Sequence, residues 1–143
     1  ENCVFCRIIR GELPSEQVYA DANVIAFHDI HPKAPVHVLV VPKEHAAKFS
    51  DYPGDESGER KLGSLFAAVN RVARQLGLDG YRIVVNVGEK GGQEVFHVHV
   101  HIMGGWEHEA VPDFSAWCIG ADGKLSLCGL EDQKVRALAP NEA

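Results

Sequence analysis

Three histidines occupy every second position of the segment 96–103, and β-branched aliphatic residues fill the positions between them. Successive side chains of a strand point to opposite faces, so an extended segment places His97, His99 and His101 in one row, about 6.6 Å apart. The aliphatic side chains then face a core, and the imidazoles are left for chemistry. Because imidazole has the unperturbed pKa nearest to neutrality, such a row can supply a nucleophile, a hydrogen-bond donor or a metal ligand.

Two other interpretations of this row compete with a catalytic strand. A histidine tag or metal-binding tail does not interleave strictly with β-branched residues, which argues against the first of them. A hydrolytic zinc site built from all three histidines is the second alternative. Positions i, i+2 and i+4 on one strand are spread too far to close around one ion unaided. The pattern therefore favours a catalytic strand over a purely structural or metal-only one.

Length and composition limit the class of protein. At 143 residues the chain has the size of one domain and can bury a core. Its net charge is −6 without a basic cluster, which argues against a general nucleic-acid binder. No apolar run has membrane-spanning length, and no charged-then-apolar signal pattern is present, so we expect a cytoplasmic protein with no membrane partner.

The elements around the histidine row are expected to form an antiparallel sheet covered by a helix. Short apolar runs bounded by turn residues predict further strands over 17–19, 23–30, 36–41 and 81–87. The second and third of these are separated by a proline-containing turn and predict a β-hairpin. Apolar residues recur at helical spacing over 62–76, after a polar loop at 53–58, and Gly77 would end that helix.

The two ends of the chain differ in texture from the middle. A short helical turn is expected over 3–10. Beyond Gly104, a small hairpin is expected from 114–119 and 125–127 around the turn 121–124. The last residues, 131–143, predict a frayed helix or a disordered end.

The four cysteines form two pairs of different character. Cys3 and Cys6 make a Cys-x-x-Cys motif at the start, whereas Cys118 and Cys128 lie in the tail. In a cytosolic chain the first pair is better explained as a metal knuckle than as a disulfide. A thioredoxin-like redox motif would follow a strand and open a helix, and nothing of that kind precedes Cys3 in this sequence.

In three segments the chain resembles the histidine triad (HIT) family. The histidine row satisfies that family's signature, His-φ-His-φ-His-φ-φ, where φ is hydrophobic. The other two segments are 3–15, with its Cys-x-x-Cys, and 26–43, with its histidines and prolines. Together they cover residues 2–106, a combination far more specific than one short motif. The ending Met103-Gly104-Gly105 resembles the Hint branch of nucleoside phosphoramidases, whereas the dinucleoside polyphosphate hydrolase branch usually continues with Pro-Arg.

This resemblance implies an architecture. It is an α+β fold with a HIT-like five-stranded antiparallel sheet, one long helix, a short N-terminal helix and an extended C-terminal tail. The HIT domain would span 1–106, and a C-terminal extension, 107–143, would pack on the domain or on a dimer partner. A homodimer is implied, and small sheets do pair through exposed edges.

The resemblance also implies an activity, that of a nucleotide hydrolase or transferase acting on the α-phosphate through a covalent nucleotidyl-histidine intermediate. The implied enzyme is a purine nucleoside phosphoramidase with AMP-amine substrates. His99 would be the nucleophile, which splits one difficult displacement into two. His101 would donate a hydrogen bond, and His37 would orient His99, unless it is simply a buried strand histidine. The alternatives are a dinucleoside polyphosphate hydrolase, a nucleotide-binding protein with incidental catalysis, and a zinc-dependent hydrolase.

Substrate contacts are implied in the same way. Backbone N–H groups near Gln93 and Glu94 would offset charge on the phosphate. The other residues of the substrate-binding set, given at the end of this paragraph, would hold the ribose, the base and the phosphate. One of them is an Asp, which can also cap a turn, and one is a lone Phe, which is usually a core residue. Many family members carry serine at position 94, and a glutamate there could favour a cationic amine as leaving group. The substrate-binding set is Phe27, Asp29, Ile30, Asn86, Gln93 and Glu94.

The metal expected from the resemblance is a structural zinc ion, with no catalytic cofactor. Its ligands would be Cys3, Cys6, His45 and His97, a closed Cys₂His₂ shell that suits tetrahedral zinc. His97 would then contribute little directly to catalysis. The alternative is two small buried cysteines beside an unrelated His45. The other histidines, His28, His31 and His108, are expected at the surface or the cavity rim.

Overall fold

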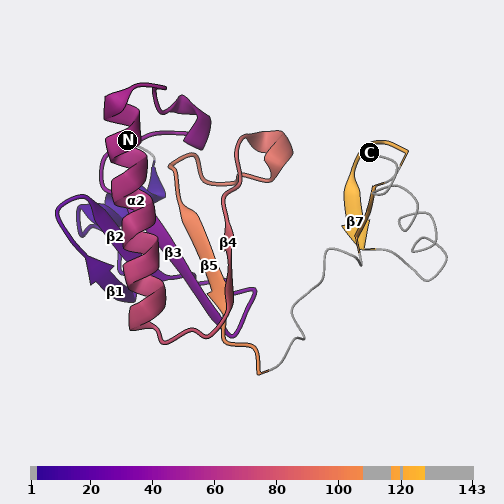
Figure 1. Cartoon of the computed structure of the whole chain (residues 1–143), viewed down its shortest axis with the longest axis horizontal. Coiled ribbons are helices and arrows are strands. Elements are labelled where there is room, and N and C mark those ends of the chain that lie inside the picture. Colours follow the sequence, from indigo (N-terminus) through magenta and orange to yellow (C-terminus); the bar gives the residue numbers. More distant parts are fainter. Residues whose placement is uncertain (1–2, 108–116, 120, 128–143) are drawn as a thin grey trace. The chain divides into compact units, whose positions relative to one another are not determined.

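The computed structural model describes residues 3–107, 117–119 and 121–127 (Figure 1). The chain divides into two compact units, Glu1–Gly105 and Trp106–Ala143. All of the predicted site residues belong to the first unit. Among the described residues no helix has both the length and the apolar composition needed to cross a membrane.

The first unit is built on a five-stranded antiparallel sheet with the order β1-β2-β3-β5-β4, which confirms the expected fold class. The predicted hairpin is the β2–β3 pair, in which Phe27 lies opposite Leu39. On the other side of β3, Leu39 lies opposite His101 of β5, so the histidine segment runs beside the hairpin. The strands are β1 (Gln17–Ala20), β2 (Val24–His28), β3 (Val36–Pro42), β4 (Tyr81–Val84) and β5 (Val100–Gly104).

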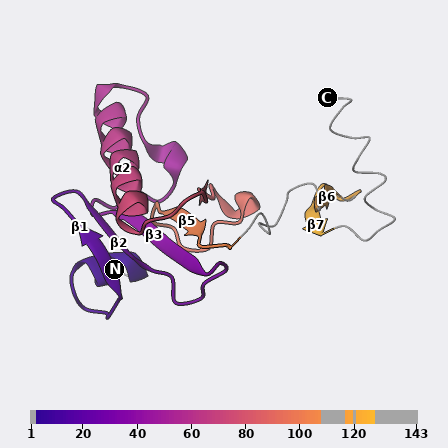
Figure 2. The ribbon, with the colours of Figure 1, turned by 60° about the horizontal axis from the view of Figure 1, so that its bottom comes forward.

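The long helix α2 (Glu56–Gln75) lies along one face of this sheet (Figures 1 and 2). It begins after Asp55, whose carboxylate accepts two backbone N–H bonds from the first turn. The helix therefore starts inside the stretch 53–58 that was predicted as loop, and the capping aspartate explains the difference. It ends before Gly77, whose φ of +68° is the left-handed conformation that glycine adopts readily at a helix end.

The sheet separates two apolar clusters. The main core lies between α2 and the sheet and contains Val98, Val100 and Ile102, as the alternation predicted. A smaller cluster lies on the opposite face, where the short helix α1 (Val4–Ile9) contributes Phe5. The other members of this smaller cluster come from β2 and β3 and are Ile25, Phe27, Leu39 and Val41.

The histidine segment is less regular than predicted, since β5 begins only at Val100. Upstream of that residue the backbone leaves the sheet, and the N–H of Val98 donates to the carbonyl of Ala46 at 2.8 Å. The neighbouring strand β4 is likewise shorter than the predicted 81–87, because it ends at Val84. The alternation of faces continues through the irregular part, so each histidine still points away from the main core.

The second unit contains the predicted hairpin in its described part. Strands β6 (Trp117–Ile119) and β7 (Leu125–Leu127) pair antiparallel around a turn. The predictions for 114–116 and 131–143 lie outside the described residues, as do His108 and Cys128.

Candidate active site

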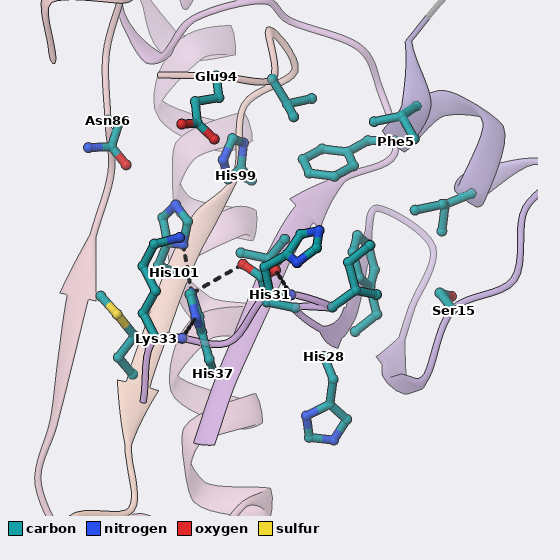
Figure 3. A pocket seen from close by; sticks show the side chains of 18 of the residues that line it. Phe5, Ser15, His28, His31, Lys33, His37, Asn86, Glu94, His99 and His101 are labelled. Carbon is teal, nitrogen blue, oxygen red and sulfur yellow. Dashed lines mark hydrogen bonds and ion pairs between the residues drawn. The ribbon is translucent and has the colours of Figure 1, made fainter. Parts of the chain in front are cut away.

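A cavity of about 630 Å³ opens on the sheet face opposite α2 (Figure 3). Its wall is formed by α1 and the loop after it, by the central strands with the β2–β3 turn, and by the segment that connects β4 to β5. Of the nine residues predicted to be catalytic or substrate-binding, eight line it: Phe27, Asp29, Ile30, His37, Asn86, Glu94, His99 and His101.

His99 is held with one nitrogen fixed to the backbone. Its Nδ1 lies 2.7 Å from the carbonyl oxygen of His97, which can only accept, so Nδ1 carries the proton and Nε2 keeps its lone pair. The ring is 8% exposed and packs edge-on against Phe5, with 5.0 Å between ring centroids. Burial lowers the pKa of His99 more than the bond to the His97 carbonyl raises it. The imidazole is therefore neutral near pH 7, as a nucleophile must be.

His37 and His101 form a hydrogen-bonded pair whose proton positions follow from one backbone donor. The N–H of Lys33 donates to His37 Nδ1 at 3.0 Å, so His37 carries its proton on Nε2. That Nε2–H donates to His101 Nδ1 at 2.9 Å. A neutral His101 has one ring proton, which must then be on Nε2, because Nδ1 accepts the bond from His37. His101 is therefore a hydrogen-bond donor through Nε2.

Burial keeps this pair neutral. The pKa of His101 is lowered to about 4, first by burial and then by the neighbouring His99 and His37. Burial also lowers the pKa of His37, against the opposing effect of the Asp29 carboxylate. His37 contacts His101 directly, and its predicted role in orienting His99 stays a prediction.

Asp29 caps a turn, as one interpretation of the sequence expected, and it also lines the cavity. Its Oδ1 accepts the N–H of His31 at 2.9 Å and so caps the β2–β3 turn. Its Oδ2 lies 3.5 Å from His37 Nε2 and belongs to a residue that lines the cavity. One carboxylate thus shapes the turn and presents an acceptor to the cavity.

The flanking wall residues differ in burial. Phe27 is 4% exposed and stacks edge-on with Phe5 at 5.6 Å, so it is both a core residue and part of the wall. Ile30 is 83% exposed and lines the cavity at its rim. Asn86 donates through Nδ2 to the carbonyl of Gly91 at 2.9 Å, and this bond stabilises the loop that connects β4 to β5.

Gln93 is not among the residues that line the cavity, and its place in the substrate-binding set stays a prediction. Its side chain is 4% exposed, and Nε2 donates to the carbonyl groups of Ala47 and Val95 at 2.7 and 3.0 Å. Its Oε1 accepts the N–H of Gly88, and its own N–H donates back to the Gly88 carbonyl. Gln93 therefore holds the loop in shape from behind the cavity wall.

Glu94 is an acidic residue close to His99 in the cavity wall. It lines the cavity and is exposed, and its carboxylate lies beside the ring of His99 in Figure 3. A negative charge at this point would repel phosphate oxygens and attract a cationic group. Glu94, which stands where many family members are expected to carry serine, is therefore an exposed part of the cavity wall.

Cys3, Cys6, His45 and His97 come together as predicted, in a cluster whose ligand atoms all lie within 4.8 Å of one another. His97 donates from Nε2 to the carbonyl of Pro42 at 2.8 Å, so its Nδ1 keeps a lone pair. That Nδ1 lies 3.3 and 3.5 Å from the two Sγ atoms and 3.1 Å from His45 Nδ1. Two sulfur and two imidazole donors at these separations fit a tetrahedral metal ion.

Two contributors to the site were not recognised in the sequence. Phe5 covers His99 from α1, and Lys33 fixes the protons of His37 and His101 through its backbone N–H. Phe5 stands between the two cysteines of the motif, which could have indicated its place. His28 and His31, expected at the surface or rim, both line the cavity.

An antiparallel α+β domain that presents two neutral histidines to a ligand-sized cavity, beside a Cys₂His₂ cluster, defines the class of protein. The model of the HIT domain matches residues 10–108, and the chain belongs to this family.

Several relatives have informative names. Over 107 residues the chain is 41% identical to the purine nucleoside phosphoramidase of Escherichia coli K12, covering 73% of this chain and 88% of the relative. A HIT family hydrolase structure from Clostridium thermocellum is 48% identical with a TM-score of 0.71, over 79% of this chain and 96% of the other. A zinc-bound histidine triad protein structure from Mycobacterium smegmatis is 32% identical with a TM-score of 0.67, covering 78% and 80% of the two chains.

Proposed function

We propose that this protein is a purine nucleoside phosphoramidase, a hydrolase that acts through a nucleotidyl-histidine intermediate. The observation that carries the proposal is the complementary state of two neighbouring histidines. His99 presents a lone pair on Nε2, and His101 presents an N–H from its own Nε2. Their ring centroids are 5.0 Å apart, so both can reach one phosphoryl group.

The first chemical step is attack by His99 Nε2 on the α-phosphorus. The new nitrogen–phosphorus bond forms as the bond to the amine breaks, and the departing amine takes up a solvent proton. The His97 carbonyl accepts from Nδ1–H and stabilises the positive charge that develops on the ring. The Nε2–H of His101 donates to a non-bridging phosphoryl oxygen and offsets its growing negative charge.

The second step is hydrolysis of the intermediate. Water adds to phosphorus, the bond to His99 breaks, and the water proton passes to solvent. A nucleoside monophosphate leaves, and His99 regains its lone pair.

The substrate would lie across the cavity with its base toward Phe27 and Ile30. Asp29 suits the ribose hydroxyls because a carboxylate can accept from both. Asn86 would lie near the phosphate, and Glu94 at the leaving-group side, where its charge favours an amine that is itself cationic. The name of the Escherichia coli relative supports a purine base and an amine leaving group.

The metal cluster is proposed to hold a structural zinc ion. The zinc-bound Mycobacterium smegmatis relative supports this choice, as does the donor set. When bound, zinc would join α1 to the β3 end and to the histidine segment, and no chemical step uses it.

A homodimer is proposed through the sheet edge. β4 is an outer strand of the sheet and exposes Tyr81 and Ile83, at 36% and 45%. Exposed apolar side chains on an edge strand favour pairing with a second copy. The packing of the extension 107–143 on the domain or the partner stays a prediction, which sedimentation of the full chain beside a chain ending at residue 106 would test.

The decisive experiment measures AMP release from adenosine phosphoramidate and from a diadenosine polyphosphate, side by side. The expected result is faster turnover of the phosphoramidate, with loss of turnover in His99→Ala at unchanged circular dichroism. Acid quenching with labelled substrate should trap a nucleotidyl adduct on the wild type only. A preference for the polyphosphate would move the chain to the other branch, and full activity of His99→Ala would refute the mechanism.

A further inference from the structure

Helix α1 connects the cysteine pair to the candidate nucleophile. Cys3 is the N-cap of α1 and Cys6 lies within it, and both sulfurs contact His97 Nδ1. Phe5, between them in the sequence, packs edge-on against His99. The short segment that carries both sulfurs therefore also carries a residue that contacts the His99 ring.

His97 makes a second connection between the two sites. Its ring belongs to the Cys₂His₂ cluster, and its carbonyl oxygen accepts from His99 Nδ1. The residue is fully buried, and its Nε2 donates to the Pro42 carbonyl, so neighbouring groups hold its ring in place beside its backbone. The bond that leaves the His99 lone pair on Nε2 thus depends on a residue of the metal cluster.

We propose that Cys3 and Cys6 are a redox modification site whose oxidation to a disulfide displaces the bound metal and disables His99. This inference rests on the role proposed for His99. Both cysteines are partly exposed, and their sulfur atoms lie within 4.8 Å of each other. A peroxide can therefore reach them, and a short movement brings the sulfurs into bonding distance.

The chemistry balances with hydrogen peroxide as the oxidant. Two thiolates lose one electron each and form one sulfur–sulfur bond, while the peroxide takes up two electrons and two protons and becomes two waters. A divalent ion bound by these thiolates would be released, because the sulfurs in a disulfide no longer carry the negative charge that would hold it.

The disulfide also changes the protein around it. The sulfurs must turn toward each other and away from His97 and His45, which they contact in the reduced state. Phe5 and the His97 carbonyl then lose the positions that hold His99. Chelation of the metal without oxidation leaves the sulfurs beside His97, so the reduced apoprotein should retain turnover at low temperature.

The test uses the full chain carrying Cys118→Ser and Cys128→Ser, so that Cys3 and Cys6 are the remaining thiols. The protein is loaded with zinc and treated with hydrogen peroxide. Intact mass should show the loss of two hydrogens, and a chromogenic chelator should detect one equivalent of released zinc. We expect kcat/KM for adenosine phosphoramidate to fall about tenfold or more, which is the usual loss when a residue that positions a site residue is changed. Reductant plus zinc should restore it.

Two controls separate oxidation from metal loss. The chelated, reduced protein should keep most of its kcat/KM at low temperature. His45→Ala weakens the cluster at an exposed ligand without touching His99, and its thiols should oxidise faster because less metal protects them.

A readout independent of turnover keeps this inference separate from the proposed function. Nitrogen-15 spectra of the histidine rings should show the Nδ1–H form of His99 in the reduced protein and its loss after oxidation. If the reduced protein hydrolyses no phosphoramidate, the proposed function fails, and the spectra still decide the coupling. A disulfide that forms without changing the His99 signals, or peroxide treatment that forms no disulfide, would overturn the inference.

Discussion

The Nε2 of His37 lies 2.9 Å from the Nδ1 of His101, on the neighbouring strand of the sheet. This single contact determines which nitrogen of His101 carries a proton toward the cavity. It starts from a backbone N–H, which cannot change its protonation, so the donor order is fixed by the fold.

Replacing His37 should therefore lower turnover through His101. His37→Leu removes the donor, lets His101 adopt the other tautomer, and should reduce kcat by about 10- to 100-fold with a smaller change in KM. His37→Gln retains an N–H near the position of Nε2 and should recover part of that loss. Equal kcat values for the two variants would show that His37 acts by packing alone.

Acid should destabilise the folded domain through His101. Its folded pKa of about 4 lies below the unfolded value of about 6.5, so the unfolded chain takes up a proton that the folded chain refuses. Above about pH 6.5 His101 is neutral in both states and costs no stability; as the pH falls toward 4 a penalty builds, which stays below about 3 kcal/mol because His101 is partly exposed to solvent. Urea unfolding at several pH values should give a shallower pH dependence for His101→Asn than for the wild type. Parallel curves would contradict this assignment.

Asp29→Asn should weaken binding of the ribose while keeping the β2–β3 turn. The amide oxygen can still accept the N–H of His31, but the charge that strengthens bonds to hydroxyls is gone. We expect KM for adenosine phosphoramidate to rise about tenfold. The control substrate is the 2′-deoxy analogue of adenosine phosphoramidate, for which the KM values of the variant and the wild type should differ much less. An equal rise for both substrates would place Asp29 away from the ribose.

Glu94→Gln should alter the choice of leaving group. The wild type should prefer lysine adenylated on its side-chain nitrogen, in which the α-amino group stays cationic, over AMP conjugated to an uncharged alkylamine. Because Glu94 is exposed, we expect the ratio of kcat/KM values to fall only about two- to fivefold in the variant. Added salt should have the same effect on the wild type. A ratio unaffected by both changes would exclude a charge effect.

Removal of zinc should lower stability before it lowers turnover. The proposed ion joins α1 to two distant segments and enters no chemical step, so the melting temperature should fall on chelation while activity at low temperature persists. Differential scanning calorimetry with and without a chelator measures the shift, and His45→Ala should show a reduced response. An immediate loss of turnover without a change in melting temperature would indicate a catalytic metal instead.

The alternation of histidines with aliphatic residues was sufficient to predict which side of the chain enters the core, and Val98, Val100 and Ile102 confirm it. It could not show where β5 starts, because that depends on the bond between Val98 and Ala46, far apart in sequence. The spacing of helical residues likewise gave the helix but not its first turn, which Asp55 caps.

The candidate site was harder to predict where backbone groups act. Side-chain types pointed to Asp29 and His101, both of which line the cavity, and their roles stay predictions. The resemblance placed Gln93 in the substrate-binding set through backbone N–H groups near it, whereas its side-chain amide bonds the backbone of Ala47 and Gly88. Lys33 acts through its N–H, which every residue except proline has, so no residue type could have indicated it.

The two faces of the sheet are covered to different extents. Twenty residues of α2 cover one face, whereas the short α1 and its small cluster cover part of the other. The two sides bury different side chains, so we expect α1 to open locally at a lower free energy than the main core. Amide hydrogens around the cavity should consequently exchange by local opening, at a lower free energy than those of β3 and α2.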